Sequence, residues 1–206
     1  SALAQQNRCA DGPIALVHFD AHFDTYGSKD YGDRPFYGNI EWAGAWGRIA
    51  HQEGLIDGDA VVQIGMRGHP VGSNEGYYGR ENGYRIIEKS EYDKIGIEET
   101  IAIIRQRVGG RPVYLTFDLD VLDTNVTAGV PNLEVGYEGM GMEECMKIIQ
   151  GMRGLNVIGA DVACLMPTKD NPNKITSMNA SVIMFEQLSL ITEYLASNNA
   201  TKKEIS

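Results

Sequence analysis

The chain has 206 residues, and 43% of them are hydrophobic, which is enough to bury the core of one globular domain. Its formal net charge of −10 disfavours binding to nucleic-acid phosphates and favours attraction of a cation, either a metal ion or a cationic substrate. The odd number of widely spaced cysteines is typical of reduced thiols in the cytoplasm, and no run approaches the roughly 18 apolar residues of a membrane span.

The first residues of the chain are typical of the last turns of a helix. Residues 2–8 run into a loop at Gly12 and Pro13, and no initiator methionine precedes them. We therefore expect the chain to be part of a longer polypeptide.

Four short apolar runs then predict β-strands at residues 13–20, 60–66, 112–120 and 155–165. Each run is nearly continuous rather than alternating, as is typical of parallel strands covered on both faces. Between and after them, helical patterns cover residues 41–54, 96–108, 141–152 and 175–197, and the polar residues 198–206 are expected to fray. This order predicts an α/β fold: one domain over residues 1–206, with three α/β/α layers around a mainly parallel, doubly wound sheet.

Potential metal ligands follow two of the predicted strands, where ligands of such sheets bind. Asp20, His22 and Asp24 follow the first strand, and Asp118 and Asp120 follow the third. In an extended segment the alternating members of each motif would point the same way. Four carboxylates converging there would repel one another unless cations neutralised them, which predicts a site for two metal ions. Either motif alone is also typical of a solvated turn.

The donor set of oxygens and one nitrogen suits Mn²⁺ and is compatible with Ni²⁺, Co²⁺ or Fe²⁺, whereas a structural zinc site is disfavoured. Two divalent ions about 3.5–4 Å apart lower the pKa of a shared water enough to form hydroxide at neutral pH. The chemistry indicated is hydrolysis. His18 precedes the motif and is expected to be a core histidine with its hydrogen bonds satisfied.

The segments DAHFD (20–24) and TFDLDVLD (116–123) together resemble the two metal signatures of the ureohydrolases, the arginase and agmatinase family, and QIGMRG (63–68) and GADV (159–162) extend the similarity. The resemblance implies an arginase-like fold and hydrolysis of guanidino groups at a binuclear manganese, sometimes nickel, centre. It also implies that Asp20 and Asp118 bridge the ions, that Asp24 completes one and orients the hydroxide, and that His22 and Asp120 complete the other.

Departures from the family pattern fall on substrate recognition. Asn132 takes the place of a threonine that positions substrate, Cys164 that of a glutamate that pairs with the guanidinium, and Ala43 that of a proton-shuttling histidine. His51 and His69 are candidate replacements for that histidine. The family's remaining histidine ligand lies upstream of the point where this chain begins. Either an N-terminal part is missing and residues 1–206 are the C-terminal two-thirds of a longer chain, which the helical start favours, or one metal ion is poorly held. Aromatic candidates for a more apolar pocket are Trp42, Trp46, Tyr77, Tyr78 and Tyr137.

The predicted function is hydrolysis of a C–N bond in a guanidino or amidine compound such as agmatine, guanidinobutyrate, a small guanidine, or a biguanide such as metformin. The products would be urea or a urea derivative and an amine. One alternative is a weakly active or inactive subunit that supports an active partner in a mixed oligomer. Another, a deacetylase-like protein that shares the fold, is less favoured because it would not be expected to carry both signatures. The family resemblance also implies a trimer or hexamer of like or unlike chains.

Overall fold

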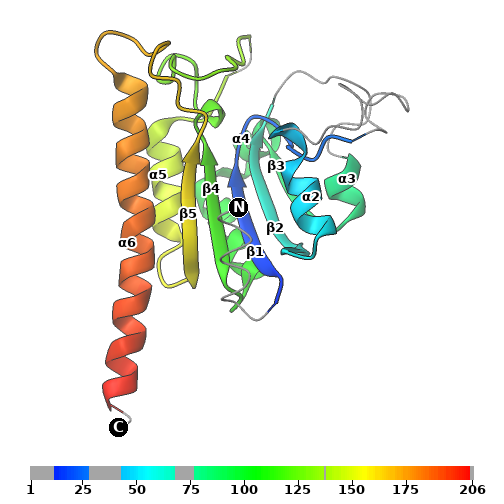
Figure 1. Ribbon diagram of the computed structural model, residues 1–206, viewed down its shortest axis with the longest axis vertical. Coiled ribbons are helices and arrows are strands. Elements are labelled where there is room, and N and C mark those ends of the chain that lie inside the picture. Colours follow the sequence, from blue (N-terminus) through cyan, green and yellow to red (C-terminus); the bar gives the residue numbers. More distant parts are fainter. Residues whose placement is uncertain (1–11, 28–42, 68–76, 137, 205–206) are drawn as a thin grey trace.

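The computed structural model describes residues 12–27, 43–67, 77–136 and 138–204, with side chains to residue 198 (Figure 1). The helix predicted at residues 2–8 lies outside the described residues. Of the helices that the model describes, none combines the length and the apolar composition needed to cross a membrane.

A five-stranded parallel sheet forms the centre of the molecule, as predicted, with the order β3-β2-β1-β4-β5 (Figure 1). The predicted runs form β1 (Ile14–Phe19), β2 (Ile56–Met66), β4 (Val113–Asp118) and β5 (Val157–Ala163). Strand order runs outward from β1 in both directions, so the chain reverses its winding between β1 and β4. In open parallel sheets, this reversal point is where a crevice forms at the carboxyl ends of the strands.

The edge strand β3 (Arg85–Glu88) and the short helix α3 (Tyr77–Glu81) were not predicted. In β3 only Ile86 and Ile87 are apolar, and the charged residues on either side are half-buried. An apolar run of two residues carries too little periodic signal to separate a strand from a loop. Pairing with β2 determines its conformation instead.

Helices cover both faces of the sheet, which confirms the predicted layers. One layer contains α4 (Lys89–Val108), α5 (Met142–Gly151) and α6 (Ile175–Glu204), and the other contains α2 (Trp46–Gln52) and α3 (Figure 1). Two predicted helix bounds were wrong. Helix α4 begins before the predicted residue 96 because Gly96, with φ of 75°, only kinks it, and α6 continues to Glu204 because its last turns contain neither proline nor glycine.

Alternate residues of the buried strands pack into two hydrophobic cores. In β1, Val17 and Phe19 face the layer of α4 to α6, whereas Leu16 faces α2. Phe19 pairs in register with Phe117 of β4, and the two rings stack with centroids 5.0 Å apart. Asp118 ends β4, and Asp20 comes directly after β1. The buried aromatic pair therefore brings the two predicted metal motifs side by side.

Candidate metal centre

Both motifs turn immediately after their strands, which corrects the prediction of extended segments. Oδ1 of Asp20 accepts the backbone N–H of His22 at 2.7 Å, and Oδ1 of Asp118 accepts the backbone N–H of Asp120 at 3.0 Å. An aspartate that accepts the N–H two residues ahead forms a side-chain-closed turn. The same local turn thus occurs twice, and turn geometry rather than strand alternation directs the side chains.

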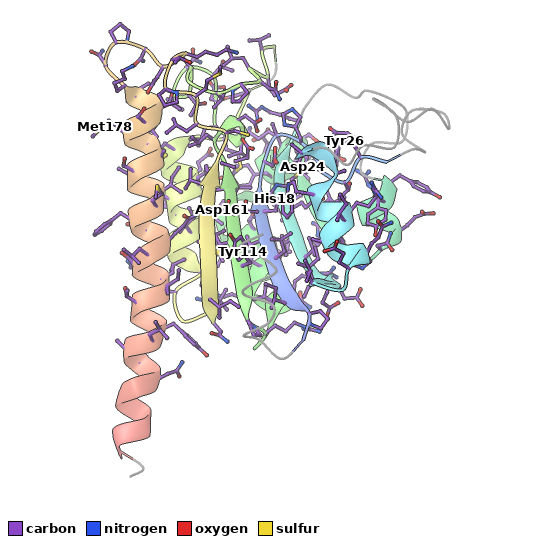
Figure 2. The ribbon with its side chains drawn as sticks, in the orientation of Figure 1. His18, Asp24, Tyr26, Tyr114, Asp161 and Met178 are labelled. Carbon is purple, nitrogen blue, oxygen red and sulfur yellow. The ribbon has the colours of Figure 1, made fainter. Side chains whose placement is uncertain are left out.

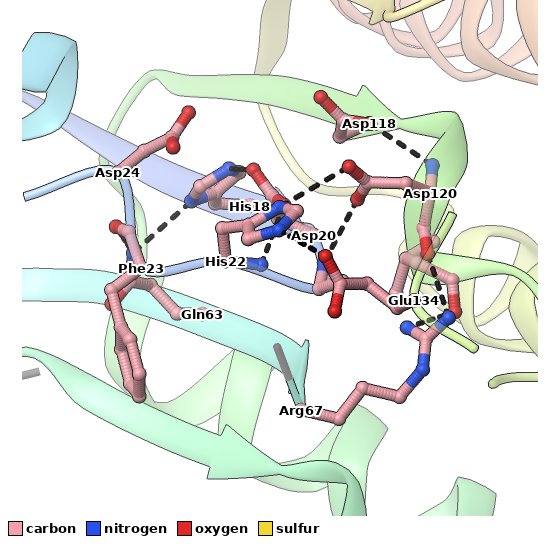
Figure 3. A network of polar contacts seen from close by, with 12 residues as sticks. His18, Asp20, His22, Phe23, Asp24, Gln63, Arg67, Asp118, Asp120 and Glu134 are labelled. Carbon is pink, nitrogen blue, oxygen red and sulfur yellow. Dashed lines mark hydrogen bonds and ion pairs between the residues drawn. The ribbon is translucent and has the colours of Figure 1, made fainter. Parts of the chain in front are cut away.

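The two turns bring the predicted ligands together at the carboxyl ends of β1 and β4 (Figure 3). Ligand atoms lie within 4.8 Å of one another in each of three groups, which are His18, Asp20 and Asp24; Asp20, His22 and Asp120; and Asp118, Asp120 and Cys164. A backbone bond from Ala21 to Oδ1 of Asp120, at 3.2 Å, joins one turn to the other. All five predicted ligands therefore belong to one connected cluster.

His22 lies between carboxylates on both sides of its ring. Its Nδ1 is 3.2 Å from Oδ1 of Asp20 and 3.2 Å from Oδ2 of Asp120, and its Nε2 is 2.7 Å from Oε1 of Glu134 (Figure 3). Sequence analysis missed Glu134, which is 112 residues away and belongs to no ligand-spaced motif. Only the folded chain reveals this contact.

His18 is a buried, hydrogen-bonded core histidine, as predicted, but one of its partners belongs to the metal motif. Its Nε2 donates to Oδ2 of Asp20 at 2.8 Å, and the amide of Gln63 donates to its Nδ1 at 3.1 Å. The ring also meets the Trp46 ring edge-on, with centroids 5.1 Å apart. His18 therefore fixes the carboxylate of Asp20 from inside the core.

Asp24 adopts a left-handed backbone conformation with φ of 51°. Two contacts from α2 hold it there: the indole Nε1 of Trp46 donates to its Oδ2 at 2.6 Å, and the backbone N–H of Gly47 donates to its carbonyl at 2.9 Å. Left-handed conformations are unfavourable for residues other than glycine, and surrounding contacts must maintain them. These contacts from α2 hold the Asp24 carboxylate in one group with His18 and Asp20 (Figure 3).

Burial and mutual repulsion make Asp24 and Asp118 hard to ionise in the protein without metal. In Asp20, by contrast, hydrogen bonds with His18 and His22 outweigh the effect of burial and lower its pKa. Burial, followed by the charge of Asp20, raises the pKa of Asp24 to about 7, and burial with the charge of Asp120 raises the pKa of Asp118 to about 6. Burial lowers the pKa of His22, but hydrogen bonds to Asp120 and Asp20 outweigh this effect and raise it to about 12. The cluster therefore favours bound positive charge.

Cys164 lies beside Asp118 at the end of β5, in a left-handed conformation with φ of 62°. Burial, followed by the charge of Asp118, raises the pKa of its thiol, which hydrogen-bonds to that carboxylate. The side chain is therefore a neutral thiol at neutral pH. Its predicted contact with substrate stays a prediction, and the structure adds that it borders the ligand cluster.

Of the other three predicted substrate contacts, Asn132 and Ala43 lie within the described residues. Asn132 is exposed in the loop that carries Glu134. Ala43 is exposed at the start of the short helix η2 (Ala43–Ala45), which the bond from the N–H of Tyr26 to the carbonyl of Gly44 holds beside the Asp24 segment. His69 lies outside the described residues, as do Trp42 and Tyr137.

His51 does not lie at the cluster, so its suggested role as a replacement proton shuttle was wrong. Its Nδ1 is 2.8 Å from the hydroxyl of Tyr78, and its ring packs edge-on against Tyr84. Its Nε2 lies beside Gly58, near the amino end of β2, whereas the cluster is at the carboxyl ends of the strands. Tyr78 therefore serves packing around His51, and Tyr77 is exposed on α3.

The residues present fit a binuclear site for hard divalent cations. Their donors are carboxylate oxygens and imidazole nitrogen, the set that Mn²⁺ and similar ions accept. In the described part of the chain, the side chains that form ion pairs with these aspartates are histidines. The guanidinium of Arg67 instead donates to the backbone carbonyls of residues 120–122. Within the described residues, the two histidines therefore do not match the four aspartates in number, which leaves room for bound metal cations.

Comparison with protein families matches residues 1–189 to the arginase family. This chain belongs to the arginase family. Its similarity to individual members of the family extends over most of the chain. It is 37% identical over 184 residues to a guanidinopropionase of Pseudomonas aeruginosa, covering 89% of this chain and 55% of that protein. It is 34% identical over 180 residues to an agmatinase of Escherichia coli, covering 86% of this chain and 51% of that protein.

Among solved structures of the family, proclavaminate amidino hydrolase from Streptomyces clavuligerus matches with a TM-score of 0.83 and 34% identity, covering 94% of this chain and 60% of that one. The arginase-like fold predicted from the motifs is thereby confirmed. The chain spans about half the length of the guanidinopropionase and the agmatinase.

Proposed function

We propose that this chain carries the catalytic centre of a hydrolase that cleaves a C–N bond of a guanidino or amidine compound and releases urea or a urea derivative and an amine. The observation that carries this proposal is the convergence of five oxygen and nitrogen donors from two motifs at the reversal point of the sheet. Family membership supports it, as do the names of two relatives, a guanidinopropionase and an agmatinase.

Asp20, His22, Asp24, Asp118 and Asp120 would hold two divalent ions, with Mn²⁺ favoured over Ni²⁺. Such ions, when bound, acidify water to a nucleophile and stabilise negative charge on the substrate. Because Trp46 holds Oδ2 of Asp24, we assign Oδ1 as the oxygen that would orient the attacking water, accept its proton and pass that proton to the nitrogen of the leaving amine. His18 and Gln63 restrain Asp20 so that its carboxylate needs little reorganisation during the reaction.

Substrate preference is proposed to depend on Cys164. A neutral thiol cannot form the bidentate ion pair that a carboxylate makes with a guanidinium group. We therefore favour a substrate that depends less on that pair, such as a guanidino acid, a small guanidine or a biguanide such as metformin. Asn132, Ala43 and His69 remain proposed substrate contacts, since their positions in the sequence motivate them.

A urea-release assay across agmatine, arginine, guanidinopropionate, guanidinobutyrate, guanidine and metformin tests the substrate. Agmatine or arginine as the best substrate would contradict the role given to Cys164. The variant Cys164→Glu should shift relative kcat/KM towards agmatine. Metal analysis of the same protein should find about two ions per chain. Substoichiometric metal without urea release would instead support the alternative of a non-catalytic subunit.

We also propose that the chain assembles with copies of itself into a trimer or hexamer. Helix α6 supports this, because it exposes apolar side chains on the face that points away from the sheet (Figure 2). These side chains include Met178, Val182 and Phe185. Exposed apolar stripes of this kind are typical of protein interfaces. Light scattering after gel filtration would give the mass of the assembly, and a monomer at micromolar concentration would contradict the proposal.

A further inference from the structure

The side chain of Glu134 is turned inward, against the usual preference of its residue type. Its side chain is 13% exposed, whereas the flanking Leu133 and Val135 are 44% and 65% exposed. Glutamate is among the residues least often buried, and leucine and valine are among those most often buried. The loop between β4 and α5 therefore exposes apolar residues while it buries a carboxylate, and this arrangement calls for a specific partner.

That partner is the ring of His22. Oε1 of Glu134 lies 2.7 Å from Nε2, on the opposite side of the ring from the two aspartates (Figure 3). A neutral imidazole carries its proton on one nitrogen and a lone pair on the other. When a metal ion displaces a ring proton, a carboxylate acceptor at Nε2 keeps the remaining proton there, which leaves the lone pair on Nδ1, facing Asp20 and Asp120.

We propose that Glu134 is a positioning residue that holds His22 in the Nε2–H tautomer, with Nδ1 directed at one metal ion; the inference rests on the proposed function. Glu134 does not bind the ion itself. It orients the ring and fixes the ligating nitrogen by accepting the proton of Nε2, as carboxylates behind metal-bound histidines do. This assigns a function to a residue outside both metal motifs.

The test compares Glu134→Ala with Glu134→Gln, because the glutamine amide oxygen still accepts a bond from Nε2–H. The matched control is Glu138→Ala, which removes an exposed carboxylate from the same loop. Mn²⁺ affinity is measured by calorimetry on metal-stripped full-length protein. The expected result is about 10- to 100-fold weaker binding for Glu134→Ala. Glu134→Gln and Glu138→Ala should stay within a few-fold of the unsubstituted protein.

A second readout follows the ring directly. In ¹⁵N NMR spectra of protein loaded with diamagnetic Zn²⁺, His22 should show a proton on Nε2, and Glu134→Ala should weaken or redistribute that signal. Urea unfolding of the metal-free variants should match the unsubstituted protein, which excludes general loss of structure as the cause.

Three results would overturn the inference. Unchanged Mn²⁺ affinity in Glu134→Ala would contradict the positioning role of Glu134 and leave the proposed function standing. Equal losses in Glu134→Ala and Glu134→Gln would show that charge, not the hydrogen bond, matters. Absence of both Mn²⁺ and Ni²⁺ binding by the unsubstituted protein would overturn both this inference and the proposed function.

Discussion

The indole of Trp46 donates a hydrogen bond of 2.6 Å to the carboxylate of Asp24, 22 residues earlier in the chain. The same ring contacts His18, which in turn donates to Asp20. Trp46 was predicted as a candidate for lining an apolar pocket, and its polar edge instead restrains a predicted metal ligand. One aromatic side chain thus links α2 to both ends of the DAHFD motif.

Trp46→Phe should weaken Mn²⁺ binding without unfolding the protein. Phenylalanine keeps most of the aromatic packing but cannot donate to Asp24, and a hydrogen bond to a charged group contributes roughly 1.5–3 kcal/mol. We expect affinity for the more weakly bound ion to fall about tenfold or more. Titration calorimetry measures this loss.

Tyr84→Phe is a control for the Trp46 variant. Its hydroxyl donates to the carbonyl of Gly47 at 3.2 Å, so this variant also removes a hydrogen bond to α2 without touching Asp24. Equal Mn²⁺ affinities in the two variants would mean that Trp46 acts through general packing of the helix.

Arg67→Met should destabilise the segment that carries Asp120. The guanidinium donates to the carbonyls of Asp120, Val121 and Leu122 at 2.9, 3.0 and 3.1 Å. Removing one charged donor leaves three carbonyls without it, at an expected cost on the order of 2–3 kcal/mol in the free energy of unfolding. Urea denaturation measures the difference.

Arg105→Met provides the comparison for Arg67. Arg105 donates to the carbonyls of Gly151 and Arg153 at the surface, where water can replace it. Its loss should cost less than about 1 kcal/mol. If both arginine variants were equally stable, the proposed support of the Asp120 segment would be refuted.

Asp118→Asn should abolish urea release and reduce the metal content below two ions per chain. The amide oxygen can still accept the N–H of Asp120, so the turn is retained while the charge that binds metal is lost. Metal analysis and the urea assay measure the two effects. Asp57→Asn makes the same change at the amino end of β2 and should leave urea release and metal content unchanged.

The metal-free protein should become less stable as the pH rises from about 4 to 7. Asp118 and Asp24 have pKa values raised to about 6 and about 7, from 3.8, so in this range they bind protons in the folded state and release them on unfolding. When the folded state binds more protons, the free energy of unfolding falls with pH. The loss from Asp118 alone is on the order of 3 kcal/mol.

Urea unfolding at pH 5 and pH 7, with chelator, measures this trend. Mn²⁺ at pH 7 should reverse the loss, because bound cations favour the ionised carboxylates. If the chelated protein were instead more stable at pH 7 than at pH 5, the raised pKa values of the two aspartates would be contradicted.

The parts of the site that sequence predicted are those that lie in short motifs at strand ends. Asp20, His22 and Asp24 follow an apolar run, and both this position and the residue types carry information. Their convergence was predicted correctly, but by strand alternation, whereas side-chain-closed turns direct the residues. Motif composition therefore located the site without giving its local geometry.

The parts that sequence could not predict depend on contacts between distant segments. Glu134 meets His22 across 112 residues, and its loop has no periodic pattern. His51 was suggested for the site because it is a histidine near a motif, yet it packs with Tyr78 and Tyr84 near the other end of β2. Tertiary packing alone brings Glu134 to the site and keeps His51 away from it.

The stacked pair of Phe19 and Phe117 fixes the distance between the two metal-binding motifs. Each ring comes one residue before an aspartate that is proposed to hold both ions, and the rings face each other in register. A slip of one residue between β1 and β4 would shift the two aspartates by about 3.3 Å and move one ring to the opposite face of the sheet. Hydrophobic packing thus sets the spacing of the metal ligands. A core mutation that touches no ligand can therefore still weaken metal binding.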